Sequence, residues 1–149
     1  MPVLAENKRL RFDYEILEDF EAGIELLGLE VKSLRKHGAT LDSAYVVIRG
    51  GEAYIMQMSI PPYQPANTPE NYDPLHTRKL ILSKDEIRDL ADVETSKGLT
   101  IVPIRVYTKG PKVKLSIGIV RGKKKFDKRE SIKERDTDRE IRRTLKYSE

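Results

Sequence analysis

The sequence predicts a mainly β protein, a small antiparallel β-barrel with one clear helix, one or two short helices and a basic C-terminal tail. Two observations predict the barrel: apolar and polar residues alternate over 112–120, and a glycine pair at 50–51 separates two β-branched, aromatic runs. A third predicts the tail. Residues 121–149 hold 12 of the 28 Lys and Arg but only 7 of the 24 Asp and Glu, so they carry the net positive charge.

The N-terminal part predicts an arm followed by a strand. Residues 1–10 resemble an arm in which Asn7, Lys8 and Arg9 form a small polar and basic patch. A solvated terminus without a binding role is the alternative. Apolar residues then fall on alternate positions over 11–20, which predicts a strand.

The next residues predict a short helix and a second strand. Residues 21–29 place apolar side chains three and four positions apart, as a short helix does, although Gly23 and Gly28 disfavour one. Residues 30–35 then predict a strand, which ends before a turn at Gly38.

A β-hairpin and a long loop occupy the middle of the chain. Residues 44–49 and 53–60 predict the hairpin, because adjacent glycines accept the positive φ angles of a two-residue turn. Residues 61–77 hold five of the eight prolines and predict an irregular connection. Its Tyr63 and Tyr72 either pack on the barrel or stack on bases, and the sequence leaves both alternatives open.

The clearest helix of the chain follows a short strand over 78–82. Ser83 can accept from the amide of Glu86 while the Glu86 carboxylate reaches back, which is a capping box. Ile87, Leu90 and Ala91 then form one apolar face, and Gly98 is the expected stop.

The last two strands of the predicted barrel cover 100–107 and 112–120. Pro103 favours an edge position or a bulge in the first of them. About six or seven antiparallel strands close most readily as a barrel of the oligonucleotide-binding type, with an open sandwich as the alternative. We therefore divide the chain into a barrel domain at 1–120 and a tail at 121–149.

The tail contains a second capping box at 131–134 but no broad apolar stripe. A lone helix this short is marginal in water, so we expect a tail that is disordered in the free protein and folds on its target.

Composition narrows the function. The chain has no Cys and only two His, at 37 and 76, so neither a disulfide, a metal cluster nor a cofactor is predicted. It has no apolar run of roughly 18 residues and no apolar signal segment, so we expect a cytoplasmic protein without a membrane partner. A pI near 9.2 makes nucleic acid the first partner to test. One enzymatic alternative exists: Glu30-Val31-Lys32 resembles half of a metal-dependent nuclease motif, with Asp13 or Asp19 as a further ligand.

Three blocks of sequence resemble the small protein B family, whose members bind transfer-messenger RNA in bacteria. The resemblance runs from about residue 7 to the end of the chain. The blocks are FEAGI with GLEVKSLR at 20–35, DPL with RKL at 73–80, and GKK, DKR and IKER at 122–135.

The resemblance implies a non-enzymatic RNA-binding protein, which we expect to be a monomer. Such a protein holds the tRNA-like domain of transfer-messenger RNA and escorts it to a stalled ribosome for trans-translation. The tail is then expected to enter the empty mRNA channel near the decoding centre and become helical.

The resemblance also implies the site residues. The expected RNA-gripping residues are Asn7, Lys8, Arg9, Glu21, Gly23, Ile81 and Lys114. The expected ribosome-reading residues of the tail are Gly122, Lys123, Lys124, Phe126, Asp127, Lys128, Arg129, Lys133, Arg135 and Leu145.

Each assignment has a structural alternative. Glu21 can cap the following helix, Ile81 can belong to the core, and Lys114 can be a solvated surface lysine. A general RNA-binding or ribosomal protein of the barrel class is the alternative for the function as a whole.

Overall fold

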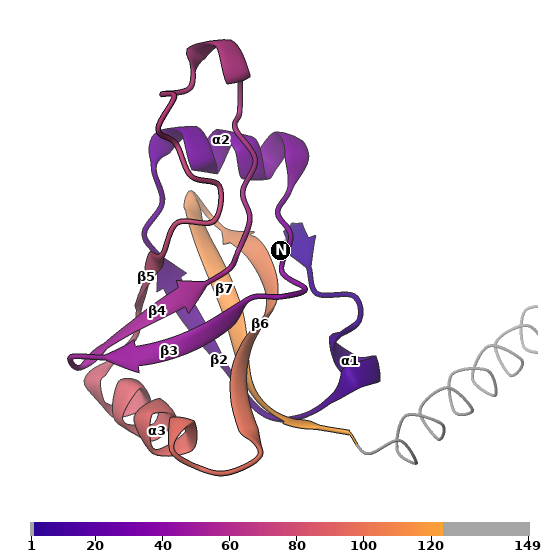
Figure 1. The fold of residues 1–149 in the computed structure, drawn as a ribbon, viewed down its shortest axis with the longest axis vertical. Helices are drawn as coiled ribbons and strands as arrows, with labels where there is room; N and C mark the ends of the chain where they lie inside the picture. The colour runs from indigo at the N-terminus through magenta and orange to yellow at the C-terminus, as the bar shows by residue number, and fades with distance from the viewer. Residues whose placement is uncertain (1, 124–149) are drawn as a thin grey trace, which may run out of the picture.

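The computed structural model describes residues 2–123, in which seven strands form one antiparallel sheet of order β1-β6-β7-β2-β5-β4-β3. Figure 1 shows α2 and α3 at opposite ends of this sheet. The elements are β1 Val3–Glu6, α1 Leu10–Asp13, β2 Tyr14–Ile24, α2 Gly28–His37, β3 Tyr45–Arg49, β4 Glu52–Met56, the 3-10 turn η1 Pro65–Asn67, β5 Arg78–Ile81, α3 Lys84–Glu94, β6 Leu99–Lys109 and β7 Lys112–Gly122. The predicted mainly β fold is confirmed.

The long strands β2, β6 and β7 form the centre of the sheet. β7 pairs with β6 on one side and with β2 on the other along almost its whole length. The register shifts between Pro103 and Arg105, so the predicted bulge at Pro103 is confirmed. A second shift lies between Ile16 and Glu18. Bulges of this kind bend a strand and increase its twist.

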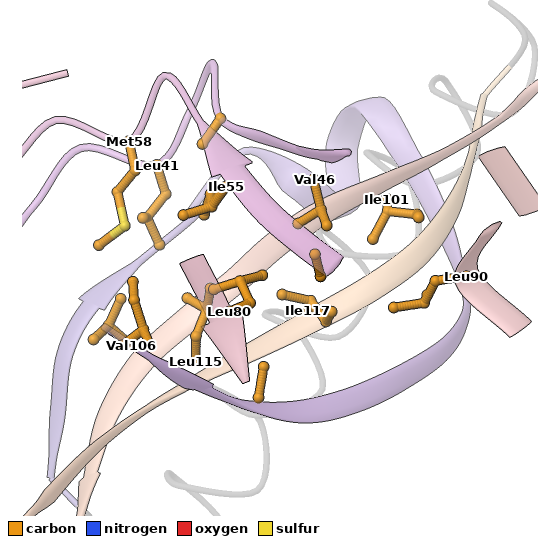
Figure 2. Close-up of a cluster of buried hydrophobic side chains, with 14 of the residues drawn as sticks. Leu41, Val46, Ile55, Met58, Leu80, Leu90, Ile101, Val106, Leu115 and Ile117 are labelled. Atoms are coloured by element: carbon orange, nitrogen blue, oxygen red, sulfur yellow. The ribbon is translucent and has the colours of Figure 1, made fainter. Parts of the chain in front are cut away.

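One hydrophobic core lies on the inner face of the sheet and draws its buried side chains from β2 to β7, α2 and α3; Figure 2 shows part of this cluster. Leu80, Leu115 and Ile117 are fully buried there, and the alternation over 112–120 predicts the burial of the last two. Leu90 of α3 closes the core at one end. A smaller cluster on the outer face joins Leu10 of α1 to Val102, Ile104 and Val120.

The sheet does not close into a hydrogen-bonded barrel within the described residues, so that part of the prediction is wrong. β1 and β3 are the two ends of the strand order. The sheet nevertheless curls, because β3 lies against β6 across the core. Contacts between β3 and β6 across the core take the place of a hydrogen-bonded ladder between β1 and β3.

The predictions for 21–29 and 30–35 are both wrong. β2 continues to Ile24, because Ala22 and Ile24 point into the core while β7 and β5 pair with the strand on either side. The residues predicted as the second strand form α2 instead. There Glu30, Ser33 and Leu34, at helical spacing, are the buried face.

The prediction of an N-terminal arm is also wrong. Residues 3–6 form β1, which pairs with β6 from Val3 opposite Tyr107 to Glu6 opposite Arg105. Residues 10–13 form the short helix α1, so the following strand begins at Tyr14 and not at residue 11. Leu10 is buried against β6 and β7, which holds this short helix on the sheet.

The turn-based predictions hold. Gly50 and Gly51, at φ values of 59° and 74°, connect β3 to β4, although β4 ends at Met56 and not at residue 60. The amide of Glu86 donates to Ser83 Oγ at 3.2 Å, and the Ser83 amide donates to Glu86 Oε1 at 3.0 Å. The predicted capping box of α3 is therefore confirmed, while the helix ends at Glu94, before the expected stop at Gly98.

The loop between β4 and β5 lies beside α2 (Figure 1). The Tyr72 hydroxyl, which has one proton to donate, lies 2.8 Å from Ile60 O and 3.0 Å from Glu30 Oε2, so this tyrosine packs against the domain. Between residues 2 and 123, no helix is long and apolar enough to cross a membrane. The predictions for the tail beyond Lys123, including its disorder and its capping box, lie outside the described residues.

Candidate nucleic-acid interface

Four of the predicted RNA-gripping residues lie together on the outer face of the sheet. Gly23 of β2 pairs with Lys114 of β7 on one side and with Ile81 of β5 on the other. Glu21 lies two residues before Gly23 on the same face. The sheet thus gathers residues that are up to about 90 positions apart in the chain, because neighbouring strands lie about 4.8 Å from each other.

Gly23, Ile81 and Lys114 line a shallow groove of about 380 Å³. A Cβ at Gly23 would lie 3.1 Å from Ile81 Cβ, so any larger residue would push Ile81 aside. Ile81 is 58% exposed although it belongs to a strand, and its alternative role as a core residue is therefore wrong. The groove offers an apolar wall from Ile81 and a cation from Lys114, which suits a base or ribose next to a phosphate.

The carboxylate of Glu21 is held by the β6–β7 hairpin. Tyr107 donates its hydroxyl proton to Glu21 Oε2 at 2.5 Å, and Lys109 Nζ donates to Oε1 at 3.3 Å. The hydrogen bond from Tyr107 is the main cause that lowers the pKa of Glu21, and the charges of Lys109 and Lys114 add to it. Burial and the same hydrogen bond raise the pKa of Tyr107 to about 12.

These contacts fix the state of the pair near neutral pH. Glu21 is an oriented carboxylate and Tyr107 a protonated phenol. Glu21 lies in the interior of β2, so it does not cap a helix, and that alternative is wrong.

Asn7, Lys8 and Arg9 lie elsewhere, between β1 and α1. The Asn7 amide donates to Ile104 O at 2.9 Å and its Nδ2 donates to Pro103 O at 3.3 Å, which fixes the end of β1 on the sheet. The Arg9 guanidinium lies 5.4 Å from the ring centre of Phe12. Three strand spacings, about 14 Å, separate β1 from β2, so this patch is distinct from the groove.

The N-terminal patch lies near the start of the tail. The Lys123 amide donates to Asp13 O at 2.9 Å, and Lys123 Nζ donates to Arg11 O at 2.7 Å. α1 therefore holds the chain at the point where it leaves β7, and Gly122 is the last residue of that strand. Lys124 and the other predicted tail residues lie outside the described residues.

Sequence reasoning missed Tyr107, Lys109 and Arg105, which surround Glu21. Tyr107 is 86 positions from Glu21, and no local pattern connects them. The available signal was the alternation of β6 and β7, which places Arg105, Tyr107 and Lys109 on one face and Lys112 and Lys114 on the facing strand.

The nuclease alternative for Glu30 does not fit the structure. Glu30 lies on a helix and not on a strand, and its carboxylate is buried against the guanidinium of Arg78. Arg78 Nε donates to Glu30 Oε2 at 2.8 Å, and the Leu27 amide donates to Oε1 at 2.9 Å. Within residues 2–123, no group of three or more His, Asp or Glu could hold a metal ion. Glu30 has a structural role.

Comparisons with known proteins identify the family. The family model described as SmpB protein matches residues 4–147. The chain belongs to the SmpB family. Among its relatives, it is 48% identical over 144 residues to the SsrA-binding protein of Thermosynechococcus vestitus, covering 97% of this chain and 95% of that protein. It is 50% identical over 145 residues to the SsrA-binding protein of Mesoplasma florum, covering 97% of each.

A solved structure of an SmpB chain has the same fold. It is described as "tmRNA-SmpB: a journey to the center of the bacterial ribosome". Its TM-score to this chain is 0.70 at 44% identity, over 84% of this chain and 87% of that chain.

Proposed function

We propose that this chain binds the tRNA-like domain of transfer-messenger RNA and delivers it to stalled ribosomes for trans-translation. One observation carries the proposal: Glu21, Gly23, Ile81 and Lys114, which the family resemblance singles out, lie in one patch on the outer face of the sheet. The names of the relatives and the solved complex of an SmpB chain support the same partners.

The chemistry of the patch suits an RNA surface. Lys114 neutralises a phosphate beside the groove, and Ile81 contacts the apolar face of a ribose or base. Gly23 has no side chain, so the RNA can approach the strand closely. The Glu21 carboxylate accepts from a base amino group or from a 2′-hydroxyl, and the latter distinguishes RNA from DNA.

The basic tail supplies a second RNA contact. Residues 121–149 carry the net positive charge of the chain, so they are attracted to a polyanion such as ribosomal RNA. The tail begins where β7 ends beside Tyr14, nine residues along β2 from Gly23 and so roughly 30 Å from the groove. One protein can therefore contact two RNA surfaces at once. We assign it the reading of the empty mRNA channel, with Phe126 stacking on a base. No catalytic step is assigned to any residue.

A binding competition tests the proposal. Labelled tRNA-like domain of transfer-messenger RNA is bound to the full chain at physiological salt, and bulk tRNA is added as competitor. Bulk tRNA should compete poorly. Equal competition would instead support the alternative of a general RNA-binding protein of the barrel class.

Truncation separates the two surfaces. A chain that ends after Lys123 keeps the Lys123 contact with α1 and all seven strands. It should bind the tRNA-like domain nearly as tightly as the full chain but fail to support peptide tagging on stalled ribosomes. Loss of RNA binding on truncation would show that binding of the tRNA-like domain and contact with the ribosome do not lie in separate segments.

A further inference from the structure

A hollow of about 330 Å³ opens on the outer face of the sheet beside Glu21. We propose that it receives one unpaired guanine of the RNA, with the Watson–Crick edge of the base directed at the Glu21 carboxylate. The proposal rests on the proposed function, because it names the RNA group that this part of the surface reads.

The register of the sheet creates the hollow. Ser116 of β7 pairs with Glu21 of β2 on one side and with Arg105 of β6 on the other. A small side chain between two long ones leaves a slot whose walls rise from Cα atoms about 10 Å apart, which is two strand spacings. Ser116 forms the floor, and the slot has room for one flat base.

The hydrogen-bonding groups of the slot select guanine. A carboxylate has about four acceptor positions, and Tyr107 and Lys109 use two of those on Glu21. The remaining two match adjacent donors, and guanine is the base whose Watson–Crick edge carries two adjacent donors, N1–H and the 2-amino group. Arg105 on the opposite wall can donate to O6 or N7 of the same base.

The charges of the slot favour a base over a phosphate. Asp19 lines it together with Glu21, and two carboxylates repel an anion. The lysines stand at the rim, where Lys109 and Lys114 act on Glu21. Between residues 2 and 123, the Arg105 guanidinium makes no hydrogen bond or ion pair, so its donors are available to a ligand.

Tyr107 acts as a positioning residue. Its ring lines the slot, and its hydroxyl fixes one carboxylate oxygen, so the two vacant acceptor positions point outward in one arrangement. A pre-oriented carboxylate does not have to lose side-chain freedom when the RNA binds.

Chemical footprinting with kethoxal tests the slot, because this reagent attacks N1 and the 2-amino group of unpaired guanine. The probe is the tRNA-like domain of transfer-messenger RNA, bound to the full chain at one fixed salt concentration. At least one guanine should be protected. Ser116→Val, which fills the floor, and Arg105→Gln, which removes the second wall, should abolish that protection and weaken binding about tenfold.

Two controls make the result decisive. Arg88→Gln removes an exposed arginine of α3 and should leave both protection and affinity unchanged. Inosine in place of the protected guanine lacks only the 2-amino group. It should weaken the binding of the wild-type chain about tenfold. With Ser116→Val, which already lacks the slot, inosine should cause no further loss of affinity. Thermal unfolding shows whether each variant folds. Arg105 is only partly buried, so Arg105→Gln tests the slot even if Ser116→Val does not fold.

The outcomes separate this inference from the proposed function. If the RNA binds but no guanine is protected, or if protection survives in both variants, the base-binding slot is wrong and the RNA-binding function stands. If the chain does not bind the tRNA-like domain at all, the proposed function fails and the slot fails with it.

Discussion

Replacement of Glu30 by glutamine is expected to destabilise the whole domain, because it leaves a buried cation without its counter-ion. Both Glu30 and Arg78 are 1% exposed. Arg78 donates to Glu30 Oε2 through Nε and Nη2, and its other donors bind Met58 O at 2.6 Å and Pro74 O at 2.9 Å. The ion pair therefore connects α2 with β5 and with both ends of the long loop.

The magnitude follows from the burial of the pair. Removing one partner of a buried ion pair costs about 3–5 kcal/mol, and the glutamine oxygen can keep some of the hydrogen bonds, which favours the lower end. For a chain of 149 residues, a loss of about 3 kcal/mol lowers the Tm by roughly 12 °C.

The effect should also depend on pH. Burial raises the pKa of Glu30, but the hydrogen bonds from Arg78 and from the Leu27 amide and the charge of Arg78 together lower it below its ordinary 4.5. A carboxyl whose pKa is lowered by folding stabilises the protein above its unfolded pKa and loses this contribution as the pH falls through the folded value. The stability difference between wild type and Glu30→Gln should therefore be present above about pH 4.5 and shrink as the pH falls below it.

Urea and thermal unfolding followed by circular dichroism measure both quantities. Glu70→Gln, an exposed change in the same loop, is the matched control and should shift the free energy of unfolding by at most about 0.5 kcal/mol. A loss below about 1 kcal/mol for Glu30→Gln, or a difference from wild type that stays constant down to pH 3, would refute the reasoning. Below its melting temperature the variant should still bind RNA, because Glu30 is buried and is not one of the residues that line the groove.

Three further predictions concern the RNA-facing surface. Lys114→Ala should make the dependence of log Kobs on log salt shallower by about 1, whereas Lys84→Ala on α3 should leave it unchanged; equal slopes for the two would remove Lys114 from the interface. Ile81→Ala should change the free energy of unfolding by only about 0.5 kcal/mol yet weaken RNA binding, while Leu80→Ala next to it should cost about 2–5 kcal/mol; the reverse order would place Ile81 in the core. Tyr107→Phe should raise the pKa of Glu21 toward 4.5, because it removes the main hydrogen bond that lowers it, and a carboxyl-carbon NMR titration with no shift would contradict the contact.

Local rules predicted the parts of the fold that local physics decides. The β3–β4 hairpin depends on two glycines at positive φ, and the start of α3 depends on the Ser83–Glu86 capping box. β7 places Leu115, Ile117 and Ile119 in the main core as its alternation predicts, although Ser116 and Val120 on the other face are buried as well. In each of these elements, neighbours in sequence make the deciding contact.

The errors fall where a distant contact decides. The sequence of residues 30–35 predicts a strand, but Arg78, 48 positions away, binds Glu30 and stabilises the buried face of a helix. β1 resembles a solvated arm until β6 pairs with it, about 100 positions later. The candidate site shows the same limit: the resemblance named Glu21, while its partner Tyr107 follows from the register of three strands.

The burial pattern of β5 is the strongest physical evidence for the site. A strand with one face in the core should bury its aliphatic residues and expose its charged ones, yet Arg78 is buried while Ile81 is exposed. The burial of Arg78 is explained by Glu30, which compensates its charge. The exposure of Ile81 has no such explanation within the sheet. Its neighbour Gly23 has no side chain to cover it, and Lys114 lies on the other side of Gly23. An exposed aliphatic residue next to a bare backbone and a cation fits a ligand that presents a sugar or base together with a phosphate, and a nucleic acid presents these groups together.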